Sequence, residues 1–332
     1  MSDKLKGILI ALALGDALGA PHEFKYTKHY KYTGTLEYPV KLFNRFQGES
    51  VFPVGSVTDD TQMTLTLAVQ IIQDNKYIKD NVILAYEKWA STAKMLGKNT
   101  RALFKGVTTL KGYQNRYTKT FSVPQSEWTQ SNGSLMRCTP FVIFESYDNL
   151  IEDIKLSNPH PVNIETGILY VFILKNLIQG YLPTIESLLQ HIKEPAVIAV
   201  LHDVANKIDR EIKGPFCSST ESKKDNDVKD IKGWVCTALY CSLYSIYHIP
   251  NLSDAYRYFI EKGGDTDTNA AILGALYGAR DGYQKLRESE SKNIDIILHC
   301  PFIGPESNPI LKDIDTTVNQ LMRISGITLN NS

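Results

Sequence analysis

Two short acidic clusters in the sequence could bind a metal ion. The first is TDDT at residues 58–61, and the second is DTDTN at residues 265–269. Each precedes an apolar helical pattern, so either one could simply cap a helix and interact with the helix dipole. A cap needs only one side chain, however, whereas each cluster offers two carboxylates flanked by hydroxyls. If the clusters meet in the fold, four carboxylates repel one another unless they are protonated or neutralised.

The ligand atoms of these clusters favour a hard divalent cation. All of them are oxygens, without His or Cys, which favours Mg²⁺ over zinc, although Ca²⁺ or Mn²⁺ could use the same ligands. A pair of such ions roughly 3.5–4 Å apart is a known catalytic arrangement. The sequence therefore predicts a metal site if residues 58–61 and 265–269 come together.

Three other segments carry residues that could act in a site. GDALGAPHEF at residues 15–24 contains Asp16 and Glu23, which by themselves are better interpreted as acids that solvate a helix end. SNGSLMR at residues 131–137 could present backbone N–H groups to a phosphate, although an ordinary turn with a Ser cap has the same pattern. His160 stands between two prolines, where a structural hydrogen bond is the commoner role.

Apolar residues recur at helical spacing through most of the chain, which predicts an all-α fold in a single domain over residues 1–332. Alternating patterns typical of strands occur only at 34–43 and 50–54. Polar loops are expected at 24–56 and 111–131, and a polar surface excursion at about 215–231. Helices are expected at about 5–12, 59–73, 80–94, 100–110, 134–145, 163–179, 184–212, 232–248, 253–262, 267–285 and 308–325.

Composition excludes several functional classes. Lys plus Arg and Asp plus Glu number 36 each, so no global field attracts nucleic acid or a membrane, although a local basic pocket is compatible with this balance. The five cysteines form no CxxC pair, which favours free thiols in a reducing compartment. The apolar run at residues 7–14 is too short to span a membrane and predicts a buried helix. We therefore expect a cytoplasmic protein without a membrane partner.

Five strings occur in an order that resembles the ADP-ribosylglycohydrolases: GDALGAPHEF, TDDTQMTLTLA, SNGSLMR, the His160-Pro161 pair and GGDTDTNAAILGALYGA. LGKNTRALFKG and KGWVCTALYCSLYSIYH are also similar to the bacterial branch, and the motif-bearing core covers about residues 5–282. The resemblance implies an all-α enzyme with two Mg²⁺ ions at the base of a cleft, with Mn²⁺ as a substitute and no organic cofactor. Its substrates would be ADP-ribosylated proteins or related ADP-ribose conjugates, including nucleic acid only where it carries ADP-ribose.

The resemblance also assigns roles to individual residues. The implied metal ligands are Glu23, Thr58, Asp59, Asp60, Asp265, Asp267 and Thr268. Glu23, Asp59 and Asp60 are the implied catalytic acids, and which group takes a proton from water stays open. The implied substrate-binding residues are Ser131, Asn132, Gly133, Ser134, Leu135, Met136, Arg137 and His160. From their location alone, the candidates for stacking adenine are Tyr113, Tyr117, Phe121 and Trp128.

One position departs from the family pattern. Many members have an acid just before the segment that here reads GKNTR at residues 97–101, whereas this chain has Met95 and Leu96. The linkage that is cleaved could therefore differ from the arginine type, or turnover could be slower. Two other functions use the same scaffold or ions: a non-catalytic ADP-ribose-binding or structural protein, and a Mg²⁺-dependent phosphoesterase. The acceptor and the oligomeric state are not determined by the sequence.

Overall fold

The computed structural model describes residues 1–23, 31–44, 48–210, 212, 233–300 and 307–325. These residues form fifteen α-helices, short 3₁₀ turns and one antiparallel hairpin of β1 (Val40–Asn44) and β2 (Gly48–Phe52). The expected all-α fold is therefore confirmed, and the two segments with a strand pattern form the small hairpin. The expected excursion at 215–231 lies outside the described residues, and the single domain stays a prediction.

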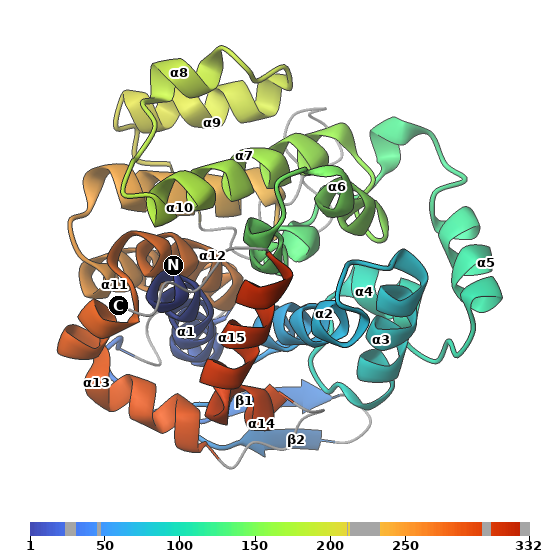
Figure 1. Ribbon diagram of the computed structural model, residues 1–332, viewed down its shortest axis with the longest axis horizontal. Helices are drawn as coiled ribbons and strands as arrows, with labels where there is room; N and C mark the ends of the chain where they lie inside the picture. Colours follow the sequence, from blue (N-terminus) through green and yellow to red (C-terminus); the bar gives the residue numbers. More distant parts are fainter. Residues whose placement is uncertain (24–30, 45–47, 211, 213–232, 301–306, 326–332) are drawn as a thin grey trace.

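Helix α1 (Ser2–Gly19) runs through the centre of the molecule (Figure 1). It is packed against α2 (Asp59–Asp74), α12 (Thr266–Asp281), α13 (Tyr283–His299) and α15 (Ile314–Ile324). The apolar stretch through residue 22 is long enough to cross a membrane by length and composition, but 94% of its apolar window is buried inside the protein. Residues 7–14 thus form a buried core helix, as predicted.

Small residues let α1 and α12 approach backbone to backbone. A Cβ atom at Gly15 would clash with the carbonyl oxygen of Ala270, and one at Gly19 would clash with that of Thr266. At the same contact, the Thr266 hydroxyl donates to the Gly19 carbonyl oxygen at 2.8 Å. This close packing brings the C-terminal end of α1 next to the N-terminal end of α12, where one acidic cluster lies.

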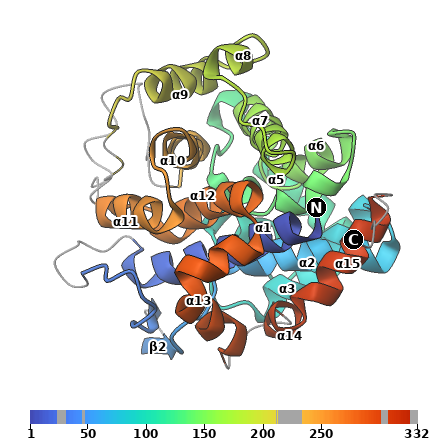
Figure 2. The same cartoon turned by 60° about the vertical axis from the view of Figure 1, so that its left-hand side comes forward.

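The other helices form layers around this centre. On one side, α7 (Pro161–Ile178) and α10 (Val235–His248) pack on α12, and α8 (Ile185–Leu189) and α9 (Pro195–Ala205) lie outside them (Figure 2). On the other side, α3 (Lys79–Thr92), α4 (Lys98–Phe104) and α5 (Leu110–Thr120) extend outward from α2 (Figure 1). The remaining helices are α6 (Asp148–Lys155), α11 (Leu252–Lys262) and α14 (Ser307–Lys312).

Three predictions of secondary structure were wrong in part. Residues 111–131 are not all loop, because α5 occupies the first half and the Thr109 hydroxyl caps it by accepting from the Gly112 N–H. The helix expected at 134–145 is a series of 3₁₀ turns. The helix expected at 184–212 is two helices, with Pro195 at the first turn of the second.

Two helix ends also differ from the prediction. Gly282 adopts φ +83° and ends α12, so the pattern at 267–285 is divided there. Residues 286–299 continue as part of α13, although no helix was predicted for them. Their sequence is largely polar, so its apolar stripe is weak. Leu286, Ile294 and Ile297 are buried in α13, which packs against α1.

Candidate active site

The predicted acidic clusters meet where α1 ends and where α2 and α12 begin. One carboxylate oxygen each from Asp16, Asp60 and Asp267 lie within 4.8 Å of one another. The same holds for Glu23, Asp265 and Asp267, so Asp267 joins the two groups. All of these side chains are buried except that of Glu23, which is partly exposed at the end of a 3₁₀ turn (Ala20–His22).

Asp16 belongs to this centre, which corrects its interpretation as an acid that solvates a helix end. Its side chain is fully buried and accepts hydrogen bonds from the backbone N–H and hydroxyl groups of Thr58 and Thr61, at 2.5–3.1 Å. Asp16 therefore holds the first turn of α2 in place from another helix. The signal for it in the sequence was its position between Gly15 and Gly19, which bring its helix against α12.

The carboxyl groups of this centre disfavour one another's charge. Burial and the charges of Asp16, Asp59 and Asp265 raise the pKa of Asp60 well above its ordinary value. Burial and the charges of Glu23, Asp265, Asp60 and Asp16 do the same for the pKa of Asp267. Burial also raises the pKa of Asp16 to about 6, despite the hydrogen bonds that it accepts. A bound cation would remove this repulsion.

One oxygen atom in the centre lacks a partner. Asp60 Oδ1 is buried and has no hydrogen-bond partner among the described residues, whereas Asp60 Oδ2 accepts from the Thr58 hydroxyl at 2.9 Å. A buried carboxylate oxygen without a donor is costly, and coordination of a cation satisfies it. The donor set, all of it oxygen, therefore fits a hard divalent metal ion, and these acidic groups could hold one.

The remaining predicted metal ligands surround the same point. Asp59 Oδ2 accepts from the Gly97 N–H at 3.0 Å, and burial raises the pKa of Asp59, with a further contribution from the charge of Asp265. Thr268 is buried, and its N–H donates to Asp267 Oδ1 at 2.9 Å. The Thr58 hydroxyl lies between the carboxylates of Asp16 and Asp60. The structure thus brings all seven predicted ligands to one region.

The predicted substrate loop adjoins the acids. Asn132 Nδ2 donates to Asp265 Oδ2 at 2.9 Å, so this loop and the start of α12 are directly linked. Asn158 and Asn163 both donate to the Ser131 carbonyl oxygen, at 3.1 and 2.8 Å. Gly133 and Ser134 complete a short 3₁₀ turn. The first half of the motif is therefore held rigidly beside the acidic centre.

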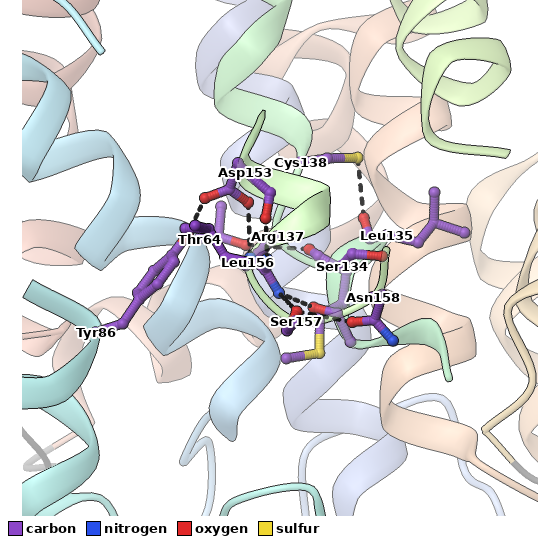
Figure 3. Close-up of polar contacts among 12 residues, drawn as sticks. Thr64, Tyr86, Ser134, Leu135, Arg137, Cys138, Asp153, Leu156, Ser157 and Asn158 are labelled. Atoms are coloured by element: carbon purple, nitrogen blue, oxygen red, sulfur yellow. Dashed lines mark hydrogen bonds and ion pairs between the residues drawn. The ribbon is translucent and has the colours of Figure 1, made fainter. Parts of the chain in front are cut away.

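The second half of the motif points into the protein (Figure 3). Arg137 is 0% exposed, and its guanidinium donates to Asp153 Oδ2, the Gly133 carbonyl oxygen and the Ser157 hydroxyl at 2.8–2.9 Å. The guanidinium of Arg137 is therefore buried and paired with Asp153 beneath the loop. This corrects the expectation that Arg137 contacts the substrate directly. The side chains of Leu135 and Met136 are buried as well.

His160 and the aromatic candidates lie at different depths. His160 is the N-cap of α7, where Nδ1 accepts from the Val162 N–H at 3.2 Å, and it is partly exposed near Gln130. Tyr113 is buried, and its hydroxyl donates to the Leu156 carbonyl oxygen at 2.7 Å, so it is a core residue and cannot stack adenine. Phe121 is only partly buried and lies between Tyr117 and Trp128, with ring centroids 4.7 and 5.5 Å away.

The departure at Met95 and Leu96 has a structural counterpart. Both side chains are buried, Leu96 in the main core and Met95 in a small cluster with Ala20, Val40 and Phe52. The position that carries an acid in many relatives is therefore filled here by apolar packing.

Comparison with known proteins agrees with this geometry. The family model for ADP-ribosylglycohydrolase matches residues 1–297. The chain is 22% identical to the ADP-ribosyl-[dinitrogen reductase] glycohydrolase of Rhodospirillum rubrum, over 89% of this chain and 91% of that protein. It is 25% identical to an ADP-ribosylarginine hydrolase of Serratia proteamaculans, over 86% of this chain and 73% of that one.

A solved structure described as an ADP-ribosylglycohydrolase-related protein complex has the same fold. It superposes with a TM-score of 0.67 at 19% identity and covers 98% of both chains. The family match spans α1 through most of α13 and includes every residue of the acidic centre. The chain belongs to the ADP-ribosylglycohydrolase family, which confirms the enzyme class expected from its motifs.

Proposed function

We propose that the protein is a Mg²⁺-dependent hydrolase that cleaves the glycosidic bond between ADP-ribose and an acceptor. The observation that supports this most directly is the buried acidic centre, in which Asp60 Oδ1 has no donor among the described residues. An acidic centre of this kind disfavours its own charge, and it lies beside the loop of residues 131–134. A metal-dependent reaction on a phosphate-bearing sugar accounts for both features together.

The proposed ligands fall into two groups around Asp267. Asp60 and Asp267 with Thr58 would hold one Mg²⁺ ion, and Glu23, Asp265 and Thr268 a second. Asp59, on which the charge of Asp265 acts, would be a further ligand. Bound there, the ions would supply orientation of the ribose hydroxyls and a lower pKa for water. Mn²⁺ is a plausible substitute because it accepts the same hard oxygen ligands.

The protein side chains would perform the rest of the reaction. Water adds to the anomeric carbon of the distal ribose as the bond to the acceptor breaks, and the acceptor leaves with a proton. Glu23 is partly exposed, and its carboxylate would accept the proton of the attacking water. Neighbouring carboxylates stabilise the positive charge that develops on the ribose. The loop at 131–134 and His160 would contact the diphosphate.

Arginine linkage is not assumed for the acceptor. The relatives named above act on ADP-ribosylated dinitrogen reductase and ADP-ribosylarginine. Here Met95 and Leu96 are packed into apolar surroundings, so an acid that would orient a leaving guanidinium has no counterpart at that position. We also propose a cytoplasmic location, since Cys138, Cys236 and Cys241 are free and buried thiols.

The test is release of ADP-ribose from arginine-linked, serine-linked and O-acetyl conjugates, with Mg²⁺ and with EDTA. Release that requires Mg²⁺ is expected from at least one conjugate. Release of phosphate or a mononucleotide would instead identify a phosphoesterase, and binding of ADP-ribose without turnover would identify a non-catalytic relative. Glu23→Gln should slow release while retaining affinity for ADP-ribose, and loss of affinity at an unchanged maximal rate would assign Glu23 to substrate binding.

A further inference from the structure

A marked excess of positive charge lies in a segment that we call the basic arm, residues 97–130. It contains six basic side chains and one acidic side chain, Glu127, in a protein whose total charge is balanced. The rest of the chain is therefore net acidic. The basic side chains are Lys98, Arg101, Lys105, Lys111, Arg116 and Lys119.

Both ends of the basic arm touch the candidate active site. At its start, the Gly97 N–H donates to Asp59 Oδ2, and Asn99 donates to the Ser157 carbonyl oxygen beneath the substrate loop. At its end, Gln130 accepts from the Trp234 indole N–H at 2.9 Å and leads directly into the loop at 131–134. Between these points, α4 and α5 project along the outer side of the molecule (Figure 1).

Part of the charge of the basic arm is directed to solvent, whereas Arg101, Lys105 and Arg116 donate to backbone carbonyl oxygens. Lys98, Lys111 and Lys119 are exposed, and none of them forms an ion pair with another described residue. Glu87, the acid of α3 whose charge acts on Arg116, is 2% exposed and lies beneath the surface. A surface of this kind attracts a polyanion.

Aromatic rings accompany the charge. Tyr117, Phe121 and Trp128 form a partly exposed series that ends shortly before the loop at 131–134 in the sequence, and their inner neighbours Phe104 and Tyr113 anchor the series in the core. Partly exposed rings beside basic side chains are typical of surfaces that bind single-stranded nucleic acid, because bases stack on the rings while phosphates pair with the cations. An acidic peptide would use the charges and leave the rings without a partner.

We propose that the basic arm binds single-stranded nucleic acid, and that the acceptor freed by this enzyme is a nucleic-acid strand. The second half of this statement rests on the proposed hydrolase function. The first half does not, and it can be measured separately on a strand that carries no ADP-ribose.

The first experiment measures binding of a fluorescent single-stranded oligonucleotide without ADP-ribose, by anisotropy over a range of salt concentrations. The double variant Lys111→Glu with Lys119→Glu should bind at least about tenfold more weakly, and the slope of log K against log salt should fall by about 1.4 if each lysine contacts one phosphate. The matched control is Lys292→Glu with Lys312→Glu, which makes the same charge change at exposed positions on α13 and α14. It should bind like the parent protein.

A second variant tests the aromatic contribution. Trp128→Ala should weaken binding of the single strand by about tenfold and affect duplex DNA much less, because only unpaired bases can stack on the ring. An equal loss of oligonucleotide affinity in the Lys111→Glu with Lys119→Glu variant and in the Lys292→Glu with Lys312→Glu control would overturn the proposal. The absence of salt-dependent binding would overturn it as well. Tighter binding of an acidic peptide than of the oligonucleotide would also overturn it and assign the surface to a protein partner.

Hydrolysis then separates the two proposals. The Lys111→Glu with Lys119→Glu variant should raise KM for an oligonucleotide with a terminal ADP-ribose and leave kcat/KM for a small conjugate unchanged. Release from small conjugates without oligonucleotide binding would overturn only the inference about the basic arm. Oligonucleotide binding without release from any substrate would support the nucleic-acid surface and overturn the proposed hydrolase.

Discussion

The protein buries two clusters of charged side chains, and only one of them is balanced. Around Arg137 and Asp153, each charge has an opposite partner, and Tyr86 donates to the second oxygen of Asp153 at 3.0 Å. Around Asp60 and Asp267, four buried acids lie close to one another and to the partly exposed Glu23, and the charges that act most on Asp60 and Asp267 among the described residues are all acidic. The charges of the first cluster are balanced as folded, whereas those of the second could hold a cation.

The difference separates a structural role from a chemical one. The Arg137 pair costs desolvation energy but leaves no group unsatisfied, and it fixes the loop above it through the Gly133 carbonyl oxygen. The acidic centre keeps an unsatisfied oxygen on Asp60, which is costly unless a ligand binds there. Burial of charge therefore does not by itself mark an active site, but unbalanced burial of several like charges does.

The largest effect is expected at the unbalanced cluster. Asp267→Asn should lower turnover by about a thousandfold, because a metal-held transition state loses several kcal/mol of stabilisation. In EDTA the same variant should unfold at the same or a higher urea concentration than the parent, because it removes a repelling charge. Kinetics with Mg²⁺ and urea titration with EDTA measure the two effects. Undiminished turnover would contradict the assignment of Asp267 as a metal ligand.

At the balanced cluster, the expected effect is on stability. Asp153→Ala should lower the free energy of unfolding by about 3–5 kcal/mol, because it leaves the Arg137 guanidinium buried without its partner. The double variant Arg137→Met with Asp153→Leu removes both charges and should recover much of that loss. Urea denaturation of both variants checks this. If the double variant were as unstable as the single one, packing and not charge balance would dominate this cluster.

The smallest effect is expected at Glu87, a buried acid outside both clusters. Its side chain is 2% exposed, neither oxygen has a hydrogen-bond partner among the described residues, and burial raises its pKa. Glu87→Met, which has a similar volume, should raise the free energy of unfolding at neutral pH by about 1–3 kcal/mol.

The sign of the pH dependence of stability at Glu87 follows from the raised pKa of its carboxyl. Between the ordinary glutamate pKa of about 4.3 and the raised value, the folded protein binds more protons than the unfolded chain, so stability falls as pH rises. The gain in the free energy of unfolding from Glu87→Met should therefore be small below about pH 4 and grow toward neutral pH. Urea titrations across this pH range measure the difference in the free energy of unfolding between the variant and the parent. A difference that does not vary with pH would show that ionisation of the buried carboxyl does not destabilise the fold.

Much of the helical fold was predictable from local patterns. The helix expected at 163–179 is Pro161–Ile178, and the one expected at 253–262 is Leu252–Lys262. These helices have clear apolar stripes or strong end signals, such as Pro161 at the first turn of α7 and the Asn251 side chain that caps α11. The prediction failed where the pattern was weak, as in α5, whose residues are mostly polar and of which only Tyr113 is buried.

The candidate site was predictable to a similar extent. Local sequence identified the acids at 58–61 and 265–269, because several oxygen ligands at one helix start exceed what a cap requires. It misjudged Asp16, because the glycines on either side of it indicate a close helix contact but not that this contact lies beside the other acids. It also misjudged Arg137, since an arginine in a loop motif carries no local sign that Asp153 will bury and pair it.

The sequence by itself determined most of the helical segments, the two acidic clusters that could hold a metal ion, and the family that the chain resembles. Periodicity, capping residues and ligand chemistry are properties of short segments, so they can be read without the fold. Only the tertiary structure decided that α1 and α12 meet at their glycines, that Asp16 joins the acids and that Tyr113 lies in the core. These outcomes depend on contacts between residues far apart in the chain, and no local pattern encodes such contacts.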